Sequence, residues 1–429
     1  MFETFRNAWK IEDLRKRLMY TLLILVLFRV GCAITVPYIN PAVLSTFFSG
    51  TEMLGYLNMM SGGALSQCAV FALGVSPYIN ASIIIQLLTV AIPALENLAK
   101  EGEEGRRKIT RITHYTAMGI AFVMSIGYYF ILRRMGALHY TSGWESWASA
   151  VVIILTFTAG SQLITWMGEQ IDSKGIGNGV SLLIFAGIIS NLFNGITGNI
   201  YTAVANGTTT AWLSVLVILL MLVVMTFAVT YVDLGERRIP LQISKQVKGR
   251  RVYGGQNTHM TLKVVSVGVL PLIFAYSLLA FPGTIGALVA PNSGFTAWCN
   301  AYLSSGSWVY MILSALLIVG FTFFYSSISF DPNKQAKQLM EQGATIPGQR
   351  GKNIRDYLAR TTNRLNLFAA LFLAVLAVIP TLLTSWVTNL PFAASSILIA
   401  VSVSLETMRT VEGELSIRGI ETDKDNGFM

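Results

Sequence analysis

The sequence predicts an all-α polytopic membrane protein with ten transmembrane helices, and two observations carry this prediction. First, 53% of the 429 residues are hydrophobic and only 12% are charged, whereas soluble domains carry about 25% charged residues. Second, apolar runs of about 20 residues, the length that spans a bilayer, recur along the whole chain. The ten expected spans are residues 18–37, 67–93, 113–132, 147–167, 178–196, 211–232, 262–283, 307–328, 365–384 and 390–408.

The N-terminal segment, residues 1–17, carries acidic and aromatic side chains before the first apolar run. This order differs from a cleaved signal peptide, whose apolar core directly follows a short basic start. We therefore expect a cytosolic amphipathic helix that lies on the membrane surface.

The second span is the most informative element, because Gly74 and Pro77 interrupt its apolar sequence. Backbone groups freed at such a break cannot face lipid, since each unsatisfied group costs several kcal/mol. The break is therefore expected to be buried in protein or to line a pathway through the membrane. The small, glycine-rich residues 58–68 before it are interpreted as a short mobile helix in the external vestibule, with a plain loop as the alternative.

The positive charges predict the orientation of the chain. An even number of spans places both termini on one side, and the excess of basic residues identifies that side as the cytosol. With this orientation, all but three of the 31 Lys and Arg lie on cytosolic segments.

Two of these cytosolic segments, residues 233–263 and 330–364, are long and basic, with glycine and proline turns in a hairpin-like polar pattern. Such clusters set topology or lie against anionic lipids, but they also attract acidic proteins and RNA phosphates. The similar size and position of the two loops favours docking of a protein or a ribosome.

A division near residue 200 separates two halves of five spans each. The N-terminal half covers residues 18–200, the C-terminal half covers residues 201–410, and residues 411–429 form a cytosolic tail. Two five-span halves have opposite topology, the arrangement of an inverted repeat whose interface commonly forms a transport path. Because no residue-level repeat supports it, this division rests on the count of spans.

The sequence predicts no enzyme site, cofactor or metal. The glycines of KGIGNG, Lys174–Gly179, lack the preceding strand and the following Lys-Ser/Thr pair of a nucleotide site, so they predict a tight turn. The cysteines and histidines are scattered without metal-ligand spacing. Only Arg29 is a secure mid-membrane charge, and it is expected to brace helices. A small-molecule secondary transporter with broken helices remains the alternative class.

Several motifs resemble, in order, those of the SecY/Sec61-alpha family, the central subunit of protein-conducting channels. The second transmembrane segment of that family resembles residues 61–88, SGGALSQCAVFALGVSPYINASIIIQLL, and its second signature resembles residues 166–188, WMGEQIDSKGIGNGVSLLIFAGI. Its cytosolic loops resemble EGEEGRRKIT, GRRVYGGQNTHMTLKV and PGQRGK. The resemblance extends over nearly the whole chain.

This resemblance implies a clamshell of two pseudosymmetric halves around an hourglass pore in the bacterial plasma membrane. Unfolded secretory polypeptides would cross through the pore, and transmembrane segments would leave sideways into lipid. The implied partners are the SecA ATPase, the ribosome, signal peptides and nascent chains, and small membrane subunits of the SecE and SecG type.

The resemblance also assigns roles to residues of this sequence. A ring of aliphatic side chains at the waist of the pore would comprise Val75, Ile79, Val180, Ile184, Ile273 and Ile399. A plug at about residues 58–71 would include Ser61, Gly62, Gly63, Ala64 and Leu65. A lateral gate between helices 2 and 3 and helices 7 and 8 would carry Ser82, Gln86 and Ser266. The docking surface for SecA or the ribosome would include Arg106, Arg107, Arg250, Arg251 and Arg350.

Overall fold

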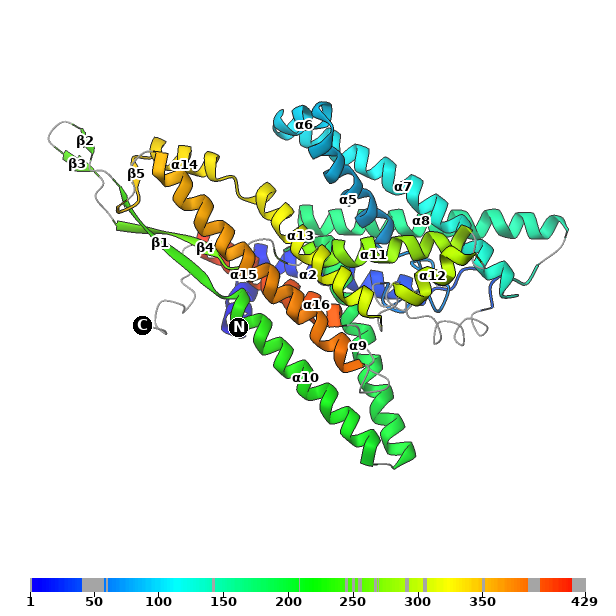
Figure 1. Cartoon of the computed structure of the whole chain (residues 1–429). Coiled ribbons are helices and arrows are strands. Elements are labelled where there is room, and N and C mark those ends of the chain that lie inside the picture. The colour runs from blue at the N-terminus through cyan, green and yellow to red at the C-terminus, as the bar shows by residue number, and fades with distance from the viewer. Residues whose placement is uncertain are drawn as a thin grey trace.

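The computed structural model of the protein is mostly helical (Figure 1). It describes residues 2–40, 58, 61–140, 143–207, 209–243, 246–248, 251–253, 257–265, 268, 270–289, 293–303, 307–348, 352–384 and 394–418. In the first half of the chain the helices are α1 (Phe2–Lys10), α2 (Glu12–Ala33), α5 (Ser76–Ala91), α6 (Pro93–Lys100), α7 (Glu103–Arg134), α8 (Trp144–Lys174) and α9 (Gly179–Asn206). In the second half they are α10 (Thr209–Asp233), α11 (Leu270–Val289), α12 (Gly294–Tyr302), α13 (Trp308–Ser329), α14 (Pro332–Glu341), α15 (Lys352–Thr384) and α16 (Ala394–Ile417).

Among the described residues, six helices are long and apolar enough to cross a membrane, and the bent pair α5 and α6 would make a seventh. These helices support a multi-pass membrane protein, but they do not confirm the count of ten. Three expected spans, those of α2, α11 and α16, fall outside this set. The apolar run of α11 is short, covering Leu270–Gly283, and α2 carries the charged residues Lys16, Arg17 and Arg29.

The second expected span begins later than its sequence suggests. The helix α5 starts at Ser76, with Pro77 in its first turn, where a missing N–H leaves no hydrogen bond unmade. Residues 61–75, called here the plug segment, form successive turns rather than the short helix expected before the break. At its other end α5 meets α6 at an angle of 98°, because the backbone is extended at Ile92 just before Pro93.

The N-terminal segment forms α1 and the start of α2, and one face of it packs against protein. Extended backbone at Ile11 separates α1 from α2. Ala8 and Leu14 are fully buried in a small apolar cluster with Val411 and Leu415 of α16. The expected boundaries at residues 17 and 410 fall inside α2 and α16, and the contact of this segment with the membrane surface stays a prediction.

The prediction of an all-α chain is wrong for the long polar loops, which form strands. The strand β1 (Glu236–Ile243) pairs antiparallel with β4 (Asn257–Lys263) on one edge and with β5 (Ala344–Thr345) on the other. At the tip, β2 (Gln246–Lys248) pairs with β3 (Arg251–Tyr253). Figure 1 shows these strands extending together with α14 at one end of the molecule.

The alternation of β1 explains why this sheet forms and what it covers. Ile239 and Leu241 point inward and are buried, whereas their neighbours along the strand are exposed. They pack against Ala336 and Leu339 of α14 and Leu358 of α15. The two basic loops therefore share one apolar core and form a single body.

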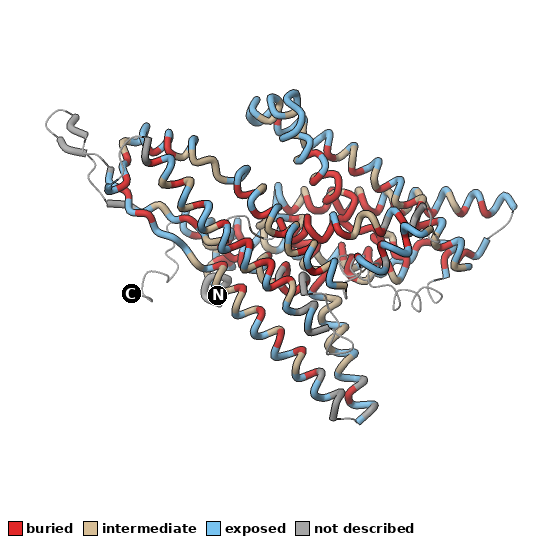
Figure 2. Tube along the Cα trace, in the orientation of Figure 1, coloured by how far each residue is buried: buried red, intermediate tan, exposed pale blue. Residues whose placement is uncertain are grey.

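The main core lies where the two halves of the chain meet. One apolar cluster draws buried side chains from α2, α5, α8 and α9 as well as from α10, α11, α13, α15 and α16. Figure 2 shows the buried residues gathered at this centre, while the long helices expose their outer faces. This cluster contains the residues of the candidate site.

Candidate functional site

The aliphatic side chains expected at the waist of the pore come together in the central cluster. Its buried members include Val75, Ile79, Ile184, Ile273 and Ile399, and Val180 packs against them partly buried. The first half of the chain contributes these residues from the start of α5 and from α9, and the second half contributes them from α11 and α16. These side chains therefore bring the two halves of the chain together in one buried apolar cluster.

The plug segment is tightly packed and contributes Ala64, Ala69, Phe71 and Val75 to this cluster. Ser61, Ala64 and Leu65 are almost completely buried. Gly62 and Gly63 adopt positive φ angles of 70° and 85°, which only glycine adopts readily. A methyl group at Gly62 would lie 3.1 Å from the Cα of Gly187 in α9, so the two backbones are in close approach.

Backbone carbonyls of the plug segment and of Asn58 accept hydrogen bonds from side chains of α2, α7, α8 and α9. The guanidinium of Arg29 donates to the carbonyl of Gly62 over 3.0 Å. Further side chains of α7, α8 and α9 donate in the same way: Tyr128 to Leu65 over 2.8 Å, Ser161 to Gly74 over 3.2 Å and Asn191 to Asn58 over 3.4 Å. Arg29 thus braces a helix against a neighbouring backbone, as its sequence position suggests.

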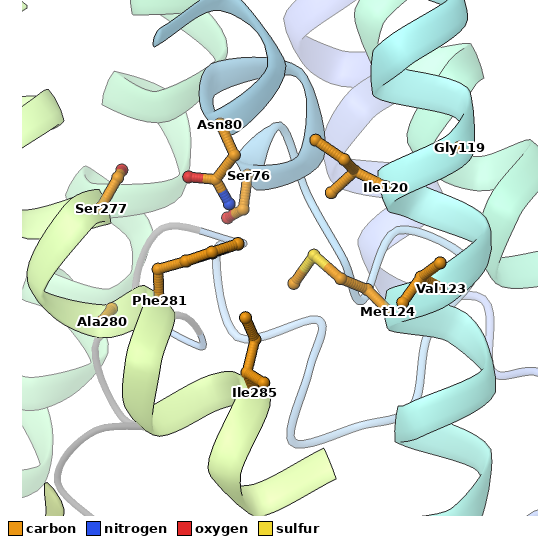
Figure 3. Close-up of a pocket in the computed structure, with 10 residues that line it drawn as sticks. All are labelled: Ser76, Asn80, Gly119, Ile120, Val123, Met124, Ser277, Ala280, Phe281 and Ile285. Carbon is orange, nitrogen blue, oxygen red and sulfur yellow. The ribbon is translucent and has the colours of Figure 1, made fainter. Parts of the chain in front are cut away.

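A cavity of about 200 Å³ lies between α5, α7 and α11, beside the central cluster. Figure 3 shows Met124 of α7 and Phe281 of α11 pointing into it from opposite sides, with Ser76 and Asn80 of α5 above them. The cavity therefore has mostly apolar walls with a few polar groups from α5. An apolar segment with a small polar element matches that lining.

Of the three expected gate residues, Ser82 and Gln86 lie on α5 and Ser266 is outside the described residues. The Gln86 amide donates to the Ser82 hydroxyl over 3.1 Å. The Tyr325 hydroxyl of α13 donates to the Gln86 oxygen, which joins the two halves of the chain. Tyr325 is a functional candidate that the sequence prediction did not include. In the sequence, only its polar hydroxyl inside an apolar run could have indicated such a role.

The expected docking arginines are described only in part. Arg106 and Arg107 are exposed near the start of α7, and Arg107 pairs with Glu103 over 3.5 Å in a solvent-exposed ion pair. Arg251 begins the strand β3 at the tip of the loop body. Arg250 and Arg350 lie outside the described residues.

Two polar contacts join helices, one between the consecutive helices α7 and α8 and one between α10 and α16, which lie far apart in the chain. The His114 imidazole of α7 lies 2.5 Å from the Glu169 carboxylate of α8. The Arg409 guanidinium of α16 lies 3.4 Å from the Asp233 carboxylate at the end of α10. This second pair borders a polar cavity of about 380 Å³ that also exposes Lys263. The tight turn predicted at KGIGNG closes through the Gly179 amide, which donates to the Asp172 carboxylate over 2.7 Å.

Within the part of the chain that the structure describes, no group of three or more His, Cys, Asp or Glu could hold a metal ion. The structure brings together a buried apolar cluster, a packed plug segment and a cavity between helices.

A family model named SecY matches residues 69–408 of the chain. The chain belongs to the SecY family. The protein translocase subunit SecY of Halalkalibacterium halodurans is 38% identical over 427 residues, which cover 97% of this chain and 98% of that protein.

Two solved structures have folds similar to that of this chain. One comes from work described as "The plug domain of the SecY protein stablizes the closed state of the translocation channel and maintains a membrane seal", with a TM-score of 0.68 and 21% identity. The other is "Sec61 in the Canine ribosome-channel complex from the endoplasmic reticulum", with a TM-score of 0.64 and 18% identity. Each likeness covers 93% of this chain and 92% of the other, and at these identities it shows the fold.

Proposed function

We propose that this chain is the protein-conducting channel of a protein translocase, through which unfolded secretory polypeptides cross the bacterial plasma membrane. The observation that carries the proposal is the apolar closure formed jointly by the two halves of the chain, with Val75 and Ile79 on one side and Ile273 and Ile399 on the other. In a member of the SecY family, a closure of this kind at the interface of the halves acts as the seal of a polypeptide pore.

The remaining parts then take roles around that pore. Ten membrane-spanning helices in two five-helix halves form a clamshell, with both termini in the cytosol. The plug segment blocks the resting pore from outside. The seam between α5, α7, α11 and α13 opens sideways, so that apolar segments leave the channel for lipid because their transfer out of water is favourable.

The cavity beside the seam supports this gate. Its apolar walls on α7 and α11 fit the core of a signal sequence, and its polar groups on α5 fit the sequence's backbone or flanking residues. The Tyr325 hydrogen bond to Gln86 closes the seam on the resting side. Opening the gate exchanges that bond for contacts with the client segment.

The channel supplies no driving force of its own. The loop body that contains β1 to β5 receives partners at the cytosolic end, where basic residues such as Arg251 complement acidic protein surfaces or RNA phosphates. We propose that SecA or the ribosome binds there, that small subunits of the SecE and SecG type clasp the helices, and that anionic lipids surround the basic segments.

Reconstitution into proteoliposomes tests the proposal. The chain, copurified with its small companion subunits, is combined with SecA, ATP and a fluorescent precursor protein, and the protease-protected precursor is measured. Protection that requires both the signal sequence and ATP supports the channel. Absence of protection in vesicles that instead accumulate a small solute would favour the secondary transporter.

A further inference from the structure

We propose that Arg29 is the latch of the closed channel: a positioning residue whose guanidinium holds the plug segment in its seat through the Gly62 carbonyl. This inference rests on the proposed channel function, and four features of the structure lead to it.

The first feature is a seat shaped for the plug segment on α2 and α9. Phe71 of the segment stacks on Phe28 of α2, with ring centroids 5.9 Å apart. A methyl group at Gly31 would lie 2.1 Å from the Phe71 ring, so glycine is required for the ring to approach α2. Gly62 meets Gly187 of α9 in the same way. The segment therefore fits between two helices with little space to spare.

The second feature is the set of hydrogen bonds that closes the seat. The side-chain donors to the plug segment's carbonyls include Arg29, Tyr128 and Ser161. Of these three donors, Arg29 alone carries a formal charge, and charge-assisted hydrogen bonds are about twice as strong as neutral ones. Its bond also holds the end of the segment that meets α9.

The third feature is the partner itself. Arg29 donates to a neutral carbonyl, and no carboxylate of the described residues lies within ion-pair distance of it. A carboxylate partner would add a Coulombic attraction to the hydrogen bond. The hydrogen bond to a neutral carbonyl stabilises the closed channel and can be exchanged for other partners when the plug segment moves.

The fourth feature is a polar cavity of about 260 Å³ beside the latch. Arg29 lines it together with Asn58, Ser66, Gln67 and Asn194. When the plug segment leaves, Ser66 and Gln67 leave with it, but the guanidinium stays beside the side-chain amides of Asn191 and Asn194 on α9 and becomes open to water, so its release does not strand a charge in an apolar site. The latch can therefore open and close repeatedly.

The test measures resting ion conductance of the companion-bound complex in planar bilayers. Arg29→Gln keeps the side chain's polarity and removes its charge; it is expected to raise resting conductance about tenfold, which corresponds to about 1.4 kcal/mol. Arg29→Lys keeps the charge but loses the planar donor fork, and an intermediate rise is expected. Arg133 is an exposed external arginine at the end of α7, so Arg133→Gln serves as the matched control, and its resting conductance should not rise.

A ring variant separates failure of the latch from failure of the channel assignment. If Ile79→Asn leaks and Arg29→Gln stays closed, the latch is overturned and the channel stands. If both variants stay closed, the proposed seal is itself wrong.

A disulfide trap distinguishes a latch from a merely structural brace. The Cys32 thiol lies 3.5 Å from the Ser61 carbonyl oxygen, so the two residues are neighbours, and Ser61→Cys should crosslink to Cys32 under copper–phenanthroline or through a short bismaleimide when the plug segment is seated. Adding Arg29→Gln should lower the yield severalfold, and adding Cys32→Ser should abolish it.

Oxidation of the Ser61→Cys, Arg29→Gln double variant should also restore low conductance, because the tether replaces the latch. Conductance that stays high after complete crosslinking would identify general damage to α2 and overturn the proposal. No crosslink with Arg29 intact would overturn the seat itself.

Discussion

Removing one hydroxyl at the proposed gate should make the channel easier to open. Tyr325→Phe deletes the donor of the hydrogen bond from α13 to Gln86 on α5. The ring itself keeps its packing, since it stacks on Phe274 with centroids 4.9 Å apart and meets Phe324 edge-on at 5.5 Å. The substitution therefore changes the polar link between the halves and little else.

The expected magnitude follows from the surroundings of Gln86. A neutral hydrogen bond contributes about 0.5–1.5 kcal/mol net, and more when its loss strands a buried partner. Gln86 is half-buried and keeps its bond to Ser82, so a value of about 1 kcal/mol applies. In the open gate the client segment or water replaces Tyr325 as the partner of the Gln86 oxygen, so the loss falls on the closed state and shifts the gate roughly fivefold toward opening.

Export of a reporter enzyme with a weakened signal sequence measures this shift in living cells. Tyr325→Phe should raise its export about fivefold, with export of a normal precursor unchanged. Tyr231→Phe, an exposed tyrosine of α10, is the matched control and should have no effect. Gln86→Ala should act in the same direction, and the double variant should add little, because both remove one bond. Unchanged or weaker export, or fully additive effects, would refute the reasoning.

Three further predictions address the seal, the docking loops and the fold. Ile79→Asn or Ile399→Asn should raise ion leakage severalfold, because a polar group wets the apolar closure; unchanged conductance in reconstituted bilayers would contradict it. Arg251→Glu should weaken SecA-stimulated transport at least severalfold and more at low salt, with thermal unfolding unchanged as the control. Arg409→Gln should destabilise the protein by roughly 3 kcal/mol, since the Asp233 carboxylate loses its partner; adding Asp233→Asn should restore part of the melting temperature.

Local chemistry allowed much of the architecture to be predicted. Apolar runs located most of the long helices, and the basic, turn-rich loops formed the expected hairpin pattern in β1 and β4. The four-residue spacing of Val75 and Ile79 placed both on one face, and the structure buries both in the same cluster. These features depend on composition and periodicity, which sequence carries directly.

The rest depends on contacts between segments far apart in the chain. The plug segment forms turns whose Leu65 and Gly74 carbonyls accept hydrogen bonds from side chains of α7 and α8. The Tyr325 bond to Gln86 spans 239 positions. The first helical region packs on α16, so Leu14 is buried by residues near position 411. No local pattern encodes such pairings.

Crosslinking to an arrested polypeptide tests the channel most directly. A photoreactive amino acid is placed at Ile79, Ile184 or Ile273 of the closure, or at the exposed positions Val223 and Leu316 as controls. A precursor is then halted midway by a folded C-terminal domain, and adducts are counted after illumination. The account predicts strong adducts from all three closure positions and almost none from the controls. Equal labelling from both sets, or no adduct from the closure, would contradict it.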